Sequence, residues 1–298
     1  MIEIDNIYNM DCLEGMRQMD SESVDLTVTS PPYDNLRTYN GYCFDFENIA
    51  KELYRVTKKG GVVVWVVGDA TINGSETGTS FRQALYFMEC GFKLHDTMIY
   101  YSDKPPLTHN RYEQKFEYMF VFSKGKPNTF NPIMINSIQV GRDKGLGGFR
   151  EPDNHLRNRN CPHPVNEKKM KGNVWVYATG FGGSTGDKDA FLHPAIFPEQ
   201  LAADHIRSWS NEGDIVLDPF MGSGTTAKMA LTLNRHYIGF EISEEYCKII
   251  EKRLMPLKTQ YKLFLPPNPD TELHCQPNSV SDCQPDSVSA SQAFSDIN

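Results

Sequence analysis

Short β-rich apolar runs alternate with amphipathic segments of helix length along most of the chain. In the first half, the helix-like segments are Leu13–Met19, Phe44–Thr57 and Thr79–Cys90. The strand-like runs there are Ile2–Ile7, Val24–Thr29, Val62–Gly68, Lys93–Tyr100 and Phe116–Phe122. This alternation is typical of βαβ units, so the pattern predicts an α/β fold with a mostly parallel sheet.

Some of these strands have a distinct pattern. The run from Val62 to Val67 is apolar at every position, which predicts a strand that is buried on both faces. Phe116–Phe122 follows Lys93–Tyr100 after only a loop, so we expect these strands to pair in antiparallel fashion.

The alternation resumes in the last third of the chain. The predicted helices there are Phe197–Trp209, Thr225–Leu233 and Glu244–Leu254, and the predicted strands are Ile215–Asp218 and His236–Glu241. After Pro256 the pattern stops. The tail from Pro266 is polar and contains the near-repeat CQPNSVSD and CQPDSVSA. Because so polar a segment buries too little apolar surface to offset its chain entropy, we expect it to be disordered.

Composition limits the class of protein. A length of 298 residues suits about one or two domains. The chain contains no apolar run long enough for a membrane helix, and its first residues lack a signal-peptide pattern. The 7 cysteines include no CxxC pair, so we expect neither a zinc ribbon nor a disulfide framework. A reducing, cytoplasmic location follows as an expectation.

Charge is distributed unevenly along the chain. The net charge is -8, which argues against a uniformly basic surface for nucleic acid. Residues 136–172, here called the basic segment, hold eight Lys or Arg against four Asp or Glu and lack periodicity. A solvated loop is one interpretation of this segment, and a local contact with phosphates is the other.

The most informative motif is a strand that ends in an acid and continues into a glycine-rich turn and a helix, Asp218-Pro-Phe-Met-Gly-Ser-Gly-Thr-Thr226. Gly222 and Gly224 permit positive φ and close backbone approach, and the following helix presents unpaired N–H groups to an anionic ligand. No Lys follows these glycines, which disfavours nucleoside triphosphates. The carboxylate of an amino-acid-like ligand fits this turn.

The next strand also ends in an acid, Glu241, about 20 residues beyond the turn. An acid at this position binds ribose hydroxyls in nucleotide-binding folds. Ser243 is placed to cap the following helix, which leaves a structural role for this region as the alternative. Together, the turn and the acid indicate an adenosine-containing cofactor.

A second motif, Thr29-Ser-Pro-Pro-Tyr33, directly follows the strand Val24–Thr29. The consecutive prolines stiffen the backbone and leave the carbonyls of Ser30 and Pro31 as fixed acceptors, while Tyr33 offers an aromatic face. Acceptors beside a stacking surface suit an amino-bearing base. A simple strand terminator is the alternative interpretation.

The pair of motifs, S/D-P-P-Y and D-P-F-x-G-S-G-T-T, resembles the signature of amino-methylating DNA methyltransferases. Because Ser30 precedes Asp218, the order resembles the circularly permuted beta group of that family. Further blocks that match are Asn9-Met-Asp-Cys-Leu-Glu14, Lys58-Lys-Gly-Gly61, Glu117-Tyr-Met-Phe-Val-Phe-Ser-Lys124, Asn173-Val-Trp175 and His193-Pro-Ala-Ile-Phe-Pro-Glu-Gln200. The resemblance covers residues 1 to about 256.

The resemblance implies a Rossmann-like, seven-stranded sheet that binds S-adenosylmethionine, permuted so that the third sheet strand, here Ile2–Ile7, comes first. It also implies the domain limits: a catalytic half over 1–135, a target-recognition segment over 136–172, a cofactor-binding half over 173–262 and a disordered tail over 263–298. The cofactor-binding residues that it implies are Asp218, Phe220, Gly222 and Gly224 along the methionine part, Thr225 and Thr226 at the helix beneath it, Glu241 at the ribose, Asp11 and Cys12 at the adenine, and Phe197 closing the pocket.

For catalysis, the resemblance implies a base that is flipped out of the duplex onto Tyr33. The hydroxyl of Ser30 and the carbonyl of Pro31 then accept hydrogen bonds from its amino group, and Pro32 completes the tetrad. The nitrogen attacks the methyl group directly, consistent with the absence of a Pro-Cys dipeptide. Ser at the first tetrad position favours cytosine-N4 as the target, with adenine-N6 as the alternative.

The basic segment falls where this family carries its target-recognition region. The residues expected to face double-stranded DNA are Arg142, Lys144, Arg150, Arg157, Arg159, Lys168, Lys169 and Lys171. The segment is short, which leaves a brief recognition sequence or help from a second copy of the chain as alternatives. A cognate restriction endonuclease is a further partner that the family suggests. A non-catalytic nucleic-acid-binding protein and a methyltransferase for RNA or protein remain competing functions.

Overall fold

The computed structural model describes residues 2–32, 44–102, 112–137, 148–158 and 166–264. Tyr33, the Arg142 and Lys144 pair, Arg159 and the polar tail therefore lie outside the described residues, so the expectations for them are not tested here.

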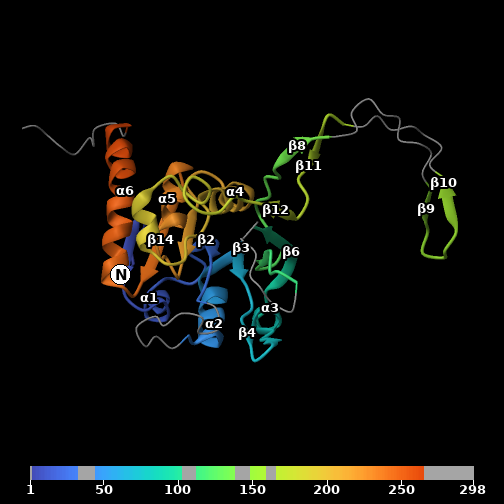
Figure 1. Cartoon of the computed structure of the whole chain (residues 1–298), viewed down its shortest axis with the longest axis horizontal. Helices are drawn as coiled ribbons and strands as arrows, with labels where there is room; N and C mark the ends of the chain where they lie inside the picture. The colour runs from blue at the N-terminus through green and yellow to red at the C-terminus, as the bar shows by residue number, and fades with distance from the viewer. Residues whose placement is uncertain (1, 33–43, 103–111, 138–147, 159–165, 265–298) are drawn as a thin grey trace, which may run out of the picture.

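The architecture is an eight-stranded sheet in the order β1-β14-β13-β2-β3-β7-β6-β12 (Figure 1). The strands are β1 Asn6–Asn9, β14 His236–Glu241, β13 Ile215–Asp218, β2 Val24–Thr29, β3 Thr57–Val67, β7 Phe116–Ser123, β6 Lys93–Tyr101 and β12 Val174–Val176. β7 runs antiparallel to β3 and β6, and the other neighbouring pairs are parallel. The antiparallel pairing of the two expected strands is confirmed, and so is the permuted order that begins at β1.

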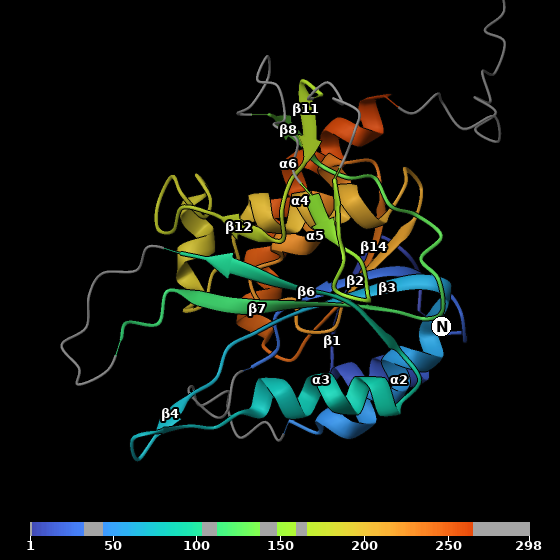
Figure 2. The same cartoon turned by 90° about the vertical axis from the view of Figure 1, so that its right-hand side faces the viewer.

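Helices cover both faces of the sheet (Figure 2). On one face lie α1 Cys12–Arg17, α2 Phe46–Val56 and α3 Thr79–Glu89, and on the other lie α4 Glu199–Trp209, α5 Thr225–Thr232 and α6 Glu244–Phe264. The helix segments come from distant parts of the chain because parallel strands need crossover connections. No helix in the described part of the chain is both long and apolar enough to cross a membrane.

Strand β3 shows why the sheet is central to the core. Val62, Val64 and Val66 are buried in the apolar cluster beneath α4 and α5, whereas Val63, Trp65 and Val67 are buried in the cluster on the opposite face. The prediction that this run is buried on both faces is confirmed. Trp65 also donates from Nε1 to Oε1 of Gln83 at 2.8 Å, so its polar atom is satisfied within the core.

The first strand differs from the prediction of Ile2–Ile7. β1 begins only at Asn6 because Asp5 has a φ of 61° and turns the chain. The Asp5 carboxylate accepts hydrogen bonds from the backbone N–H of Tyr237 at 3.2 Å and lies 2.7 Å from Nδ1 of His236. This polar turn fixes the point at which β1 starts to pair with β14, at Asn6 and Ile238.

Helix limits differ in places where proline is involved. α4 begins at Glu199 rather than Phe197, because the residue before Pro198 is disfavoured in helical conformation. α6 instead continues through Pro256 to Phe264, although Pro256 cannot donate a backbone hydrogen bond.

Several short elements were not predicted. β12 adds an eighth strand beyond the expected seven, and it was missed because only Val174–Val176 pair with β6. The others are the ribbons β4 Thr71–Ile72 with β5 Ser75–Glu76, β8 Met134–Asn136 with β11 Lys168–Met170 and β9 Gly148–Arg150 with β10 Leu156–Asn158, and the 3-10 helix η1 Lys188–Leu192. Strands of so few residues carry too little periodicity to predict.

Candidate cofactor and base pocket

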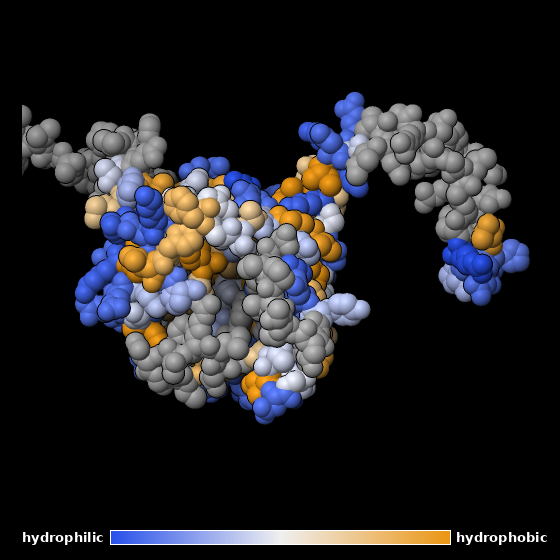
Figure 3. Space-filling view, in the orientation of Figure 1, coloured by the Kyte–Doolittle hydropathy of each residue, from blue (hydrophilic) through white to orange (hydrophobic). Residues whose placement is uncertain are grey.

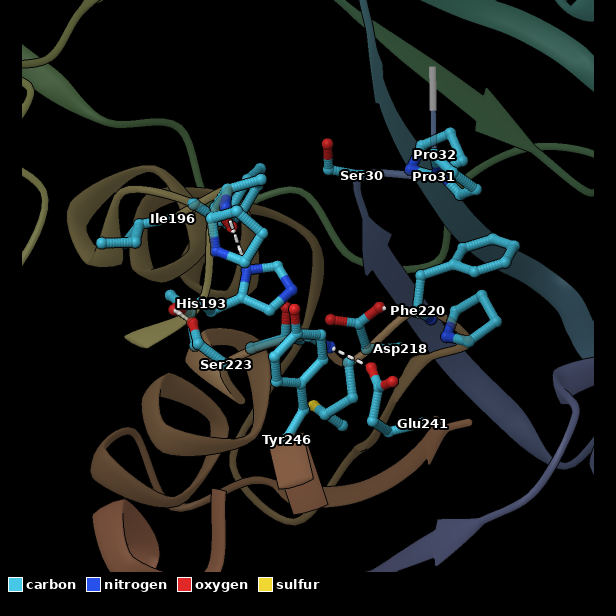
Figure 4. A pocket seen from close by; sticks show the side chains of 18 of the residues that line it. Ser30, Pro31, Pro32, His193, Ile196, Asp218, Phe220, Ser223, Glu241 and Tyr246 are labelled. Atoms are coloured by element: carbon cyan, nitrogen blue, oxygen red, sulfur yellow. Dashed lines mark hydrogen bonds between the residues drawn. The ribbon is translucent and has the colours of Figure 1, made fainter. Parts of the chain in front are cut away.

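A cavity of about 430 Å³ lies where β2, β13 and β14 end at their carboxyl edges. Its lining combines residues of both sequence motifs, including Ser30, Pro31 and Pro32 from the first and Asp218 and Gly222 from the second (Figure 4). This edge is where open α/β sheets bind ligands. The structure thus brings the two motifs, far apart in sequence, to one site.

A buried hydrogen bond joins the motifs directly. Oγ1 of Thr29, the residue before Ser30, donates to Oδ1 of Asp218 at 2.6 Å. The same carboxylate oxygen accepts from the backbone N–H of Phe220 at 3.0 Å. Burial raises the pKa of Asp218 to about 6, although these hydrogen bonds act to lower it. β2 and the start of the glycine-rich turn are therefore held in register at the pocket.

The glycine-rich turn, residues 218–224 and here called the glycine loop, requires glycine at two positions. Gly222 has a φ of 53° and Gly224 a φ of 79°, a region that side chains disfavour. A Cβ on Gly222, which lines the cavity, would lie 3.2 Å from the ring of His193. A Cβ on Gly224 would lie 2.5 Å from Ile250 of α6. Gly222 therefore keeps space at the cavity, whereas Gly224 permits close packing of α6.

Glu241 lies at the cavity and holds the glycine loop from the next strand. Its Oε2 accepts from the backbone N–H of Gly222 at 2.8 Å, and its Oε1 accepts from that of Ser243 at 2.8 Å. Burial raises the pKa of Glu241, and the charge of Asp218 adds to this effect. Each carboxylate oxygen has a further lone pair, so hydroxyl donors of a ligand can still bind. Ser243 caps α6 as the alternative interpretation expected, since its Oγ accepts from the Tyr246 N–H at 3.4 Å.

The other expected cofactor residues divide between the cavity and its support. Cys12, Phe197, Phe220 and Thr225 line the cavity. Asp11 lies outside this lining and instead caps α1, where its Oδ1 accepts from the backbone N–H of Leu13 at 2.8 Å and of Glu14 at 3.2 Å. Thr226 lines the cavity and ties α5 to β2, since its Oγ1 donates to the carbonyl of Val28 at 3.2 Å.

Sequence reasoning missed part of the lining. Tyr100 and Glu117 are paired residues of β6 and β7 that line the cavity together with Ser30. Burial raises the pKa of the Tyr100 phenol to about 12, with Glu117 adding to the effect, so the phenol is protonated at neutral pH. His193 packs its ring at 4.4 Å from that of Tyr246 on a further side of the cavity. Polar residues within the otherwise apolar matching blocks were the available signal.

The basic segment is only partly described. Arg150 on β9 and Lys168 and Lys169 on β11 are exposed, and hydrophilic and hydrophobic residues share the β8–β11 ribbon (Figure 3). Arg157 lies on β10, in a stretch whose side chains are not described. Lys171 is placed differently from the expectation, because its Nζ lies 3.6 Å from Asp204 and 4.5 Å from the centre of the Trp175 ring. Its charge is compensated within the body of the protein.

The residues at the cavity fit S-adenosylmethionine. A glycine cradle, Gly222, is placed beside an acid, Glu241, at the ends of adjacent strands. This pairing provides backbone space for the amino-acid part and an acceptor for the ribose. The cavity volume of about 430 Å³ is within the usual range for small-molecule sites.

Comparison with known proteins agrees with this site. A family described as DNA methylase matches residues 24–252. The orphan methyltransferase M.BamHII of Bacillus amyloliquefaciens is 60% identical over 235 residues, which is 78% of this chain and 89% of that protein. The DNA adenine methyltransferase YhdJ of Escherichia coli is 30% identical over 266 residues, 85% of this chain and 83% of that one.

The fold is also similar to solved structures. The PvuII DNA methyltransferase, described as cytosine-N4-specific, superposes with a TM-score of 0.64 at 20% identity, covering 88% of this chain and 93% of that one. At that identity the likeness concerns the fold alone. The cofactor is S-adenosylmethionine, and the chain belongs to the N6/N4 DNA methylase family.

Proposed function

We propose that this chain transfers a methyl group from S-adenosylmethionine to the exocyclic amino group of a base flipped out of double-stranded DNA, with cytosine-N4 as the target. One observation carries the proposal: Ser30 and Pro31 line the same cavity as Gly222 and Glu241. The amino nitrogen of a stacked base is out of reach of any such cavity, so the base must leave the duplex.

Catalysis in this site is mainly positioning of the reactants. The bound cofactor supplies an electrophilic methyl group. Glu241 accepts hydrogen bonds from ribose hydroxyls, while the glycine loop accommodates the amino-acid part. Ser30 Oγ and the Pro31 carbonyl accept hydrogen bonds from the amino group of the base, which orients its nitrogen lone pair toward the methyl group. We propose that Tyr33, next in sequence after Pro32, stacks on the base.

The proposed DNA contacts lie on the basic segment. Arg150, Lys168 and Lys169 are exposed and free to approach phosphates. Arg142, Lys144, Arg157 and Arg159 extend the same basic composition. The relative M.BamHII is described as an orphan methyltransferase, which favours action without a cognate restriction endonuclease.

Cytosine-N4 is proposed because Ser30 occupies the first tetrad position, as the family resemblance implies for that target. The experiment is expression in a methylation-free host, followed by sequencing with a readout that separates N4-methylcytosine from N6-methyladenine. N4-methylcytosine at one short sequence is the expected result. N6-methyladenine would replace the base assignment, and unmodified DNA would favour a non-catalytic protein or an RNA or protein substrate.

A further inference from the structure

Arg253, on α6, is a buried cation that belongs to neither sequence motif. Its side chain has 0% of its surface exposed. A buried charge is strongly unfavourable unless it is paired and hydrogen-bonded, so the partners of Arg253 indicate what its position requires.

The guanidinium group uses its separate nitrogens on separate parts of the chain. Nε lies 2.8 Å from Oδ2 of Asp187, and Nη2 lies 2.8 Å from Oε1 of Glu199. Nη1 donates to the backbone carbonyl of Ser223. Lys228 balances the second carboxylate, with Nζ 2.7 Å from Oε1 of Glu199. Burial acts to raise the pKa of Asp187, but Arg253 and the other donors around it hold that pKa below its usual value.

Each of these partners supports one wall of the cavity. Ser223 is part of the glycine loop and itself lines the cavity. Asp187 caps η1, which ends directly before His193. Glu199 is the first residue of α4 and follows Phe197 and Pro198. One side chain therefore joins three segments that meet only around the cofactor pocket.

The contact with Ser223 fixes the peptide group at the centre of the glycine loop. Its carbonyl accepts from Arg253, and the N–H of the same peptide, which belongs to Gly224, donates to the carbonyl of Met221 at 2.8 Å. The flanking glycines Gly222 and Gly224 are conformationally permissive, so the loop has many alternative conformations when this peptide is released. A ligand then has to order the loop on binding, which weakens its affinity.

We propose that Arg253 is a positioning residue for the cofactor: it holds the Ser223 peptide, and with it the glycine loop, in the conformation that binds S-adenosylmethionine. This inference rests on the proposed cofactor site. Lys cannot substitute fully, because an ammonium group lacks the planar fork that reaches two carboxylates and a carbonyl at once. The effect is on cofactor binding rather than on the methyl-transfer step.

The test compares Arg253→Lys with Lys252→Ala, a matched control on the same helix whose exposed ion pair with Asp189 is 2.9 Å long. Hydrogen exchange measured by mass spectrometry on the cofactor-free proteins reports loop order directly. In Arg253→Lys we expect faster exchange confined to residues 218–226, with β3 unchanged. The Kd for S-adenosylmethionine should rise by about ten- to a hundredfold. At saturating cofactor, kcat should stay close to that of the parent, and the control should match the parent in all three measurements.

Several outcomes would overturn the proposal. They are parental loop exchange and parental Kd in Arg253→Lys, faster exchange throughout the sheet, or a lower kcat with an unchanged Kd. If neither Arg253→Lys nor Arg253→Gln folds, Arg253 is a folding determinant and the positioning role is wrong. A parent protein that binds no S-adenosylmethionine would contradict the proposed function instead, while the exchange comparison would still decide the role of Arg253.

Discussion

Replacing Asp218 with Asn separates the cost of burying this carboxylate from its use in the site. Asp218 is 4% exposed, and burial raises its pKa from 3.8 to about 6. A carboxyl whose pKa is raised on folding stabilises the protein fully below its unfolded pKa, and that stability is lost as pH rises through the folded value. The shift of about two pKa units corresponds to about 3 kcal/mol of stability lost between pH 4 and pH 7.

Asp218→Asn does not titrate, yet its amide oxygen can still accept from Thr29 and from the Phe220 N–H. The free energy of unfolding of variant minus parent should therefore grow by about 3 kcal/mol from pH 4 to pH 8. Urea denaturation of the cofactor-free proteins across this range is the assay. Any fixed cost of the amide cancels in the comparison between pH values. A difference that does not change with pH would refute the account of Asp218 as a buried carboxylate that is hard to ionise.

Three further predictions concern other parts of the site. Gly222→Val should weaken S-adenosylmethionine binding at least about tenfold in calorimetry, because the side chain meets His193 and the φ is positive; parental binding would show that the cofactor lies elsewhere. Ser30→Ala should slow single-turnover methylation by about tenfold or more with unchanged cofactor affinity, and an unaltered rate would contradict its role. Lys168→Ala with Lys169→Ala should make the salt dependence of DNA binding shallower by about two units in filter binding, whereas a parental slope would exclude these residues from the interface.

The sequence predicted the sheet because its strands are long and apolar on one or both faces. Val62 to Val67 had to lie at the centre, and the order of Ser30 before Asp218 already indicated the permutation that the sheet shows. Chain turns set by a single side chain escaped prediction. Asp5 delays β1 through contacts with β14, which lies at the other end of the sequence.

The site was predictable where residue type and backbone position both matter. Gly222 and Glu241 are examples, since a positive φ and a strand-end acid each carry a sequence signal. Roles that depend on tertiary contact gave no such signal. Asp11 caps a helix instead of lining the cavity, Lys171 turns toward Asp204, and Arg253 reaches the glycine loop from an ordinary amphipathic helix.

The most direct test of the central claim is nucleoside analysis after incubating the purified protein with duplex DNA and S-adenosylmethionine that carries a deuterated methyl group. If one cavity joins the cofactor to the amino group of a flipped base, mass spectrometry will show deuterated N4-methyldeoxycytidine with the parent and almost none with Ser30→Ala. DNA that stays unlabelled, while the same protein binds the cofactor, would contradict the claim.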